Sequence, residues 1–117
     1  MMRGRLIRHK KIWIYPIAID FRKQMNGLVQ VVIEAMGARP NDAAIYVFQN
    51  RQKNKLKLLM WDRNGFLMGY KRLERGKFDF PRQEKSVEIT WNQFIELFSG
   101  MPMVYLGKGV EKETEFA

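Results

Sequence analysis

The sequence contains no cysteine and one histidine, so disulfide bonds and zinc sites built on thiolates are excluded. The single histidine, His9, has cationic neighbours on both sides, and their charges disfavour binding of a metal cation there. No stretch reaches the roughly 18 apolar residues of a membrane span. The basic N-terminal segment is interrupted by Pro16 and has no signal-peptide cleavage pattern. We therefore expect a cytoplasmic protein.

Acidic residues are also scarce. Asp and Glu number 12 against 21 Lys and Arg, which gives a net charge of +9 and a pI near 10.0. A phosphoryl-transfer enzyme of the RNase-H-like type needs three carboxylates around two metal ions. The candidates fit a helix cap, a turn and loops better than a convergent set; they are Asp20, Asp62, Asp79 and Glu84. No nucleophile–base pair and no glycine-rich phosphate loop is visible, so we expect no catalysis, no metal and no cofactor.

The chain is nevertheless rich in core-forming residues. Of its 117 residues, 46% are hydrophobic and 13% aromatic, which favours a globular fold over disorder. A chain of this length forms one domain that removes roughly 65% of its unfolded surface from water. We expect that domain to span residues 1–106. The polar segment 107–117 is expected to be a frayed tail.

Apolar spacing predicts two helices. A stripe at i, i+3, i+4, i+7, i+8 and i+11 follows Asp20, a good N-cap residue, and stops at Gly37. The stripe consists of Met25, Leu28, Val29, Val32, Ile33 and Met36. Thr90 and Gln93 form a capping box before a second stripe that ends at Gly100.

Strands are predicted at 11–15, 44–49, 55–61 and 66–73, with further short candidates at 77–80 and 87–89. The expected fold is α+β: an antiparallel sheet of about four to five strands with a central basic hairpin, and two amphipathic helices packed on one face. The three tryptophans, Trp13, Trp61 and Trp91, fit core positions better than base-stacking positions. Phe48 is also expected in the core, and Leu58 and Met60 on the helix-packed face.

The hairpin between 55 and 73 allows two registers. A bulge at Gly65 places Lys57 opposite Lys71, whereas a two-residue loop of Asn64 and Gly65 places Lys57 opposite Arg72. Either register brings like charges together, which is unfavourable unless the charges are screened or bound.

Positive charge is concentrated in and around this hairpin. Residues 51–85 contain eleven Lys and Arg against four acids, which accounts for +7 of the net +9. Such one-signed charge is self-repulsive unless an anion docks on it, and a two-stranded ribbon is narrow enough for a DNA major groove. The alternatives are a solvated basic surface or a charged edge that prevents strand-to-strand aggregation.

A second basic element is the pair Arg22 and Lys23, which is expected in the first helical turn. Backbone N–H groups there bind anions, although Asp20 could instead neutralise the pair. The predicted nucleic-acid-binding residues are Arg22, Lys23, Arg51, Lys53, Lys55, Lys57, Lys71, Arg72, Arg75 and Lys77.

The pattern F-x-N-R-x-x-x-x-x-K-x-L-x-W-D-x-x-G-F, followed by K-R-L-E-x-G-x-F-x-x-P, spans Phe48 to Pro81. Upstream, D-x-R-K-x-x-x-G-L begins at Asp20. Together these motifs resemble the small accessory protein, often labelled TnpB, of bacterial insertion sequences of the IS66 family. The resemblance covers roughly residues 12 to 102. At Gln24 the chain departs from the family pattern, which has glycine there.

The resemblance implies a role in transposition, and the charge favours DNA as the partner. We expect a non-catalytic accessory protein, associated with the bacterial nucleoid, that binds the ends of the element through the basic hairpin. The alternative is an adaptor that docks on the separately encoded transposase without contacting DNA. An RNA-binding regulator is a weaker third possibility.

Overall fold

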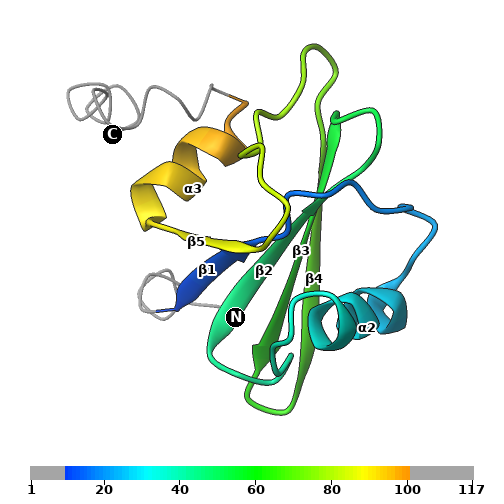
Figure 1. Ribbon diagram of the computed structural model, residues 1–117, viewed down its shortest axis with the longest axis vertical. Coiled ribbons are helices and arrows are strands. Elements are labelled where there is room, and N and C mark those ends of the chain that lie inside the picture. Colours follow the sequence, from blue (N-terminus) through cyan, green and yellow to red (C-terminus); the bar gives the residue numbers. More distant parts are fainter. Residues whose placement is uncertain (1–9, 101–117) are drawn as a thin grey trace.

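The computed structural model describes residues 10–100, which form a five-stranded sheet in the order β4-β3-β2-β1-β5 (Figure 1). The strands are β1 (Lys11–Ile14), β2 (Ala44–Gln49), β3 (Lys55–Asp62), β4 (Gly65–Arg72) and β5 (Val87–Ile89). The helices are α2 (Met25–Glu34) and α3 (Trp91–Phe98). The α+β class and the number of strands are as predicted, whereas the expected tail at 107–117 lies outside the described residues.

The sheet is mixed rather than purely antiparallel. β1 and β2 run parallel, and every other neighbouring pair is antiparallel. A parallel pair requires a long crossover, and α2 lies in the connection between β1 and β2. Because the helix carries the chain back to the end of the sheet where it started, β2 can pair in the direction of β1.

The two helices cover opposite faces of the sheet, so the prediction that both pack on one face is wrong. Leu28 and Val32 of α2 pack with Tyr46 and Phe48. On the other face, α3 packs on the cluster that contains Ile45 and Val47 (Figure 1). The reason is that all six residues of β2 are buried, and a strand that is apolar on both sides needs a cover on both sides.

The first helix begins later than predicted. It starts at Met25, its N-cap Gln24 makes no side-chain capping bond, and Asp20 instead accepts a hydrogen bond from the backbone N–H of Arg22. Asp20 is therefore a turn residue and not the predicted cap. The helix also ends earlier than the predicted stop at Gly37, at Glu34 with Ala35 as its C-cap; Gly37 follows in the loop with a φ of +63°, a left-handed conformation that suits glycine. The capping box of Thr90 and Gln93 is also present.

The hairpin lies at one edge of the sheet rather than at its centre, and neither predicted register is formed. Its loop consists of Arg63 and Asn64, and Arg63 adopts the left-handed conformation with φ of +55°. Lys57 then lies opposite Tyr70, and the like-charged pair is Lys55 with Arg72. The segment 77–80 forms no strand, although Phe78 and Phe80 are buried in the core.

Core positions are predicted correctly for Phe48, which is fully buried, and incorrectly for Trp61, which is half-buried. Trp61 packs edge-to-face on Phe66 across the hairpin, with 5.0 Å between ring centroids. Leu58 and Met60 do lie on the face that α3 covers.

We expect Phe48→Ala to lower the free energy of unfolding by about 3–5 kcal/mol, because it leaves a cavity between α2 and the sheet. Trp61→Ala should cost less, about 1–2 kcal/mol, because the ring is half solvated and loses mainly its contact with Phe66. Urea unfolding followed by circular dichroism measures both. Equal losses for the two variants would contradict this assignment of the core.

Candidate nucleic-acid interface

The turn between β2 and β3 is organised by one buried asparagine. Asn50 Oδ1 accepts from the backbone N–H of Lys55 at 2.9 Å, and Nδ2 donates to Asn54 Oδ1 at 2.8 Å and Gln52 Oε1 at 3.1 Å. Its backbone carbonyl accepts from the N–H of Lys53, whose φ is +64°. Asn50 is 5% exposed. These bonds fix the backbone, so the exposed side chains of Arg51 and Lys53 project from a defined turn.

The segment that contains Arg22 and Lys23 lies beside this turn. Lys57 joins the two, since its Nζ donates to the carbonyl of Lys23 at 2.8 Å and of Phe21 at 3.0 Å. The ammonium also lies 4.8 Å from the centroid of the Phe21 ring. Lys57 is only 6% exposed, and burial lowers its pKa, with a smaller contribution from the charge of Lys55. The ammonium of Lys57 therefore binds backbone carbonyls of the fold itself and does not face a ligand.

A surface hollow of about 500 Å³ forms between these two segments. It brings together three predicted site residues, Arg22, Arg51 and Lys55. Asp20 also lines it and forms an ion pair with Arg22, with 2.6 Å between Asp20 Oδ2 and Arg22 Nη2. Hydrogen bonds from Arg22 lower the pKa of Asp20 to about 2. Neutralisation of Arg22 by Asp20, the alternative raised from the sequence, is thus observed.

Arg22 and Lys23 do not occupy the first turn of a helix, because α2 begins only at Met25. The predicted anion site on helical N–H groups is therefore not formed by this pair. What places Arg22 near the other cations is the backbone hydrogen bond from Ile19 to Gln49, 3.0 Å long, which holds the segment against the end of β2.

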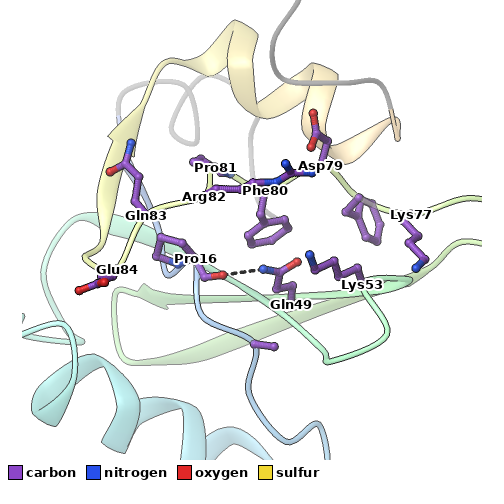
Figure 2. A pocket seen from close by; sticks show the side chains of 12 residues that line it. Pro16, Gln49, Lys53, Lys77, Asp79, Phe80, Pro81, Arg82, Gln83 and Glu84 are labelled. Atoms are coloured by element: carbon purple, nitrogen blue, oxygen red, sulfur yellow. Dashed lines mark hydrogen bonds between the residues drawn. The ribbon is translucent and has the colours of Figure 1, made fainter.

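A second hollow of about 680 Å³ lies on the other side of the same turn (Figure 2). It contains Lys53 and Lys77, both predicted site residues, and also Arg82. The backbone N–H of Phe78 donates to the carbonyl of Lys53 at 2.7 Å, so the segment that carries Lys77 is held against the turn. Cations from the turn thus face two hollows: Arg51 and Lys55 the first, Lys53 the second.

The K-R-L-E motif makes contacts within the fold. Lys71 Nζ donates to the carbonyl of Phe98 at 2.5 Å and lies 4.4 Å from the centroid of its ring. That carbonyl ends α3, where backbone oxygens lack helical partners and a cation is favourable. Arg72 forms an ion pair with Glu74, with 3.0 Å between Arg72 Nη2 and Glu74 Oε2. Leu73 packs on the core and donates its N–H to Asn54.

Of the ten predicted residues, the two hollows thus bring together Arg22, Arg51, Lys53, Lys55 and Lys77. Lys57 and Lys71 are bound inside the fold, and Lys23, Arg72 and Arg75 are exposed outside both hollows. Sequence reasoning missed Gln49, a buried side chain of the second hollow. The available signal was a polar residue that ends an otherwise apolar run.

Within residues 10–100, no three His, Cys, Asp or Glu side chains are gathered in a way that could hold a metal ion. None of the helices in this part of the chain is long and apolar enough to cross a membrane.

The geometry defines a class of protein: an α+β domain with a basic turn between two hollows. Comparison with known proteins identifies the family: residues 10–106 match the family described as IS66 Orf2 like protein, and the chain belongs to it. The chain is therefore a second-reading-frame product of the kind that IS66 insertion sequences carry, as the motifs predicted.

Two proteins of Sinorhizobium fredii (strain NBRC 101917 / NGR234) are similar to this chain. "Uncharacterized protein y4jC" is 32% identical over 112 residues, which cover 94% of this chain and 96% of the relative. "Uncharacterized protein y4hO" is 32% identical over 92 residues, which cover 78% and 80%. No solved structure matches the chain.

The Asp20–Arg22 pair makes a prediction for pH dependence. The folded pKa of Asp20, about 2, lies below the ordinary value of 3.8 for an aspartate, so the pair stabilises the fold above pH 4 and this contribution is lost as the pH falls toward 2. We expect Arg22→Gln to return the pKa of Asp20 toward 3.8, as measured by NMR titration of its carboxyl carbon. Arg39→Gln, which removes a cation paired with Asp42, is the control and should leave Asp20 unchanged. An unaltered pKa in Arg22→Gln would refute the pairing.

Proposed function

We propose that the chain is a non-catalytic accessory protein of insertion-sequence transposition that binds DNA through the turn 50–54 and the two hollows beside it. The observation that carries this proposal is the convergence of cations from distant segments at one end of the sheet. Arg22, Arg51 and Lys55 line the first hollow, and Lys53, Lys77 and Arg82 line the second.

The geometry suits phosphate binding better than a uniformly charged surface does. The backbone of the turn is fixed by Asn50, so its cations are held in place without the fold losing further freedom on binding. Each phosphate that a Lys or Arg neutralises releases counterions, which supplies sequence-independent affinity. The interface is this end of the sheet rather than the length of the hairpin, because Lys57 and Lys71 are bound to carbonyls.

In this proposal the natural ligand is the end of the element, bound in the cytoplasm at the nucleoid, and the cognate transposase is a further partner. Arg22 would exchange Asp20 for a phosphate on binding. A protein that contributes backbone and charge contacts at the ends could hold them for the transposase without taking part in the chemistry.

The adaptor reading is favoured by a different surface. Within residues 10–100, β4 is an edge strand paired with β3 alone, and it exposes Leu67, Met68 and Tyr70, which are 43%, 36% and 56% exposed. A long apolar edge strand readily pairs with a strand of another chain. Docking of the transposase there would leave the basic end of the sheet accessible, so the two functions are compatible.

Neutralising the interface should weaken DNA binding in a salt-dependent way. If six phosphates are contacted, log K should fall with log salt with a slope near −5, at about −0.9 per phosphate. The triple variant Arg51→Gln, Lys53→Asn, Lys77→Gln should make that slope shallower by about 3 units. Asn is chosen at 53 because it tolerates the left-handed conformation of that residue. Fluorescence anisotropy with terminal-repeat duplexes, with and without transposase, measures the slope.

The control removes the same charge from the other end of the sheet, through Lys11→Gln, Arg39→Gln and Arg63→Asn, with Asn at 63 because that residue also has a left-handed conformation. Lys11 pairs with Ala44, at the end of β2 opposite Gln49, and Arg63 lies in the hairpin loop at that same end. We expect the control to shift the slope by less than 1 unit. Equal effects of the two triples would show that net charge matters and the turn does not. Absence of DNA binding by the parent protein at low salt would favour the adaptor.

The purified protein should neither nick nor join the ends of the element in the presence of Mg²⁺ or Mn²⁺. The basis is the lack of a convergent acidic set within residues 10–100. Incubation with a labelled terminal-repeat substrate, followed by a denaturing gel, tests this. Cleavage that disappears in Asp62→Asn would establish catalysis and overturn the proposal.

A further inference from the structure

The second hollow contains a buried side-chain amide whose oxygen has no hydrogen-bond partner within the described residues. Gln49 is 3% exposed, and its Nε2 donates to the backbone carbonyl of Pro16 at 2.6 Å (Figure 2). Because a carbonyl only accepts, this bond fixes the orientation of the amide and turns Oε1 away from Pro16. No described residue donates to Oε1, although the atom is buried. A buried acceptor without a donor is costly, so Gln49 is poised to accept from a ligand.

The walls around this acceptor are apolar and rigid. Figure 2 shows the ring of Phe80 directly across from the Gln49 amide, with Pro16 and Pro81 beside it. Phe80 is 6% exposed and belongs to the core on the α3 side of the sheet, so the wall does not depend on a mobile loop side chain. The volume of about 680 Å³ lies within the range of about 300–1,000 Å³ that is usual for small-molecule sites.

Charge is distributed unevenly around the hollow. Lys53 and Lys77 lie on one side of it and Glu84 on the other (Figure 2). A ligand with an anionic group and N–H donors would therefore orient itself: the anion toward the two lysines, the donors toward Gln49 and Glu84. Arg82 and Asp79 also line the hollow.

We propose that the second hollow receives an unpaired nucleobase, with Gln49 Oε1 accepting from an N–H of the base and Lys53 and Lys77 binding the adjoining phosphate. A base combines a flat apolar ring, N–H donors at its edge and a covalently attached phosphate, which matches the wall, the acceptor and the cations in turn. This inference rests on the proposed DNA-binding function and deepens it: the protein would recognise DNA whose bases are unstacked, as at a frayed or nicked end, and not only duplex phosphates.

The test compares three probes of equal length by fluorescence anisotropy: a blunt duplex, the same duplex with a two-nucleotide overhang, and that overhang with abasic sites in place of both bases. The abasic probe keeps every phosphate, so it isolates the contribution of the bases. We expect the overhang to bind about 5-fold or more tightly than the abasic probe. Gln49→Met, close in size but without the acceptor, should reduce that ratio to near 1.

The side chain of Gln49 also holds Pro16, so the variant could lose stability. The parent protein then answers the same question: on titration with a deoxynucleoside monophosphate, the Gln49 side-chain amide resonance should shift, whereas deoxyribose 5-phosphate should leave it in place. Equal binding of all three probes by the parent protein would overturn the base pocket and leave the duplex interface intact. Failure to bind any of them would overturn both. A shift of the Gln49 resonance with transposase but with no nucleotide would make the hollow a protein-docking site instead.

Discussion

Burial of β2 on both sides constrains most of the described fold. All six residues of this strand, Ala44–Gln49, are shielded from solvent, so the sheet needs a cover on each face and the two helices must separate. Polar and charged side chains can then leave the sheet only at its ends and edges. The two hollows and the basic turn lie just beyond the last residue of β2, Gln49, where the side chains that follow the buried strand are exposed to water.

Two lysines of the hairpin turn their charge toward the interior, where backbone carbonyls accept from them. Lys57 and Lys71 extend to opposite faces of the sheet, and each reaches a carbonyl of the segment that covers its face: Lys57 that of Phe21 and Lys23 before α2, Lys71 that of Phe98 at the end of α3. Each ammonium also lies over an aromatic ring. The pattern of lysine in this family motif is therefore partly a pattern of fold contacts, and charge counted along the sequence overstates the charge available to a ligand.

The cations that remain exposed gain their arrangement from this scaffold. Asn50 fixes the turn, and Lys57 anchors the Arg22 segment beside it. The hydrogen bond from Phe78 to Lys53 draws the segment after β4 to the other side. Membership in the IS66 Orf2-like family links such a surface to an insertion sequence. The proposed DNA interface lies at the end of the sheet where these cations are exposed. The proposed base pocket rests on the oxygen of the Gln49 amide, which is the unpaired acceptor at that same end.

Features that depend on neighbours along the chain could be predicted from the sequence: the apolar stripe of α2, the capping box of α3, the strands of the hairpin, the excess of positive charge and the family motifs. These are encoded by spacing within one element, where geometry is known before folding. Even the double-sided burial of β2 was present in its unbroken run of apolar residues.

Other features follow from the folded domain and not from the sequence pattern: the parallel pairing of β1 with β2, the separation of the helices, the edge position of the hairpin and the internal role of two lysines. Each of these depends on groups far apart in the chain, such as Lys57 and the carbonyl of Lys23, 34 residues away. The sequence alone does not tell whether the ammonium of a lysine binds water, a phosphate or a backbone carbonyl. The choice is made by which backbone the fold brings within about 3 Å of it.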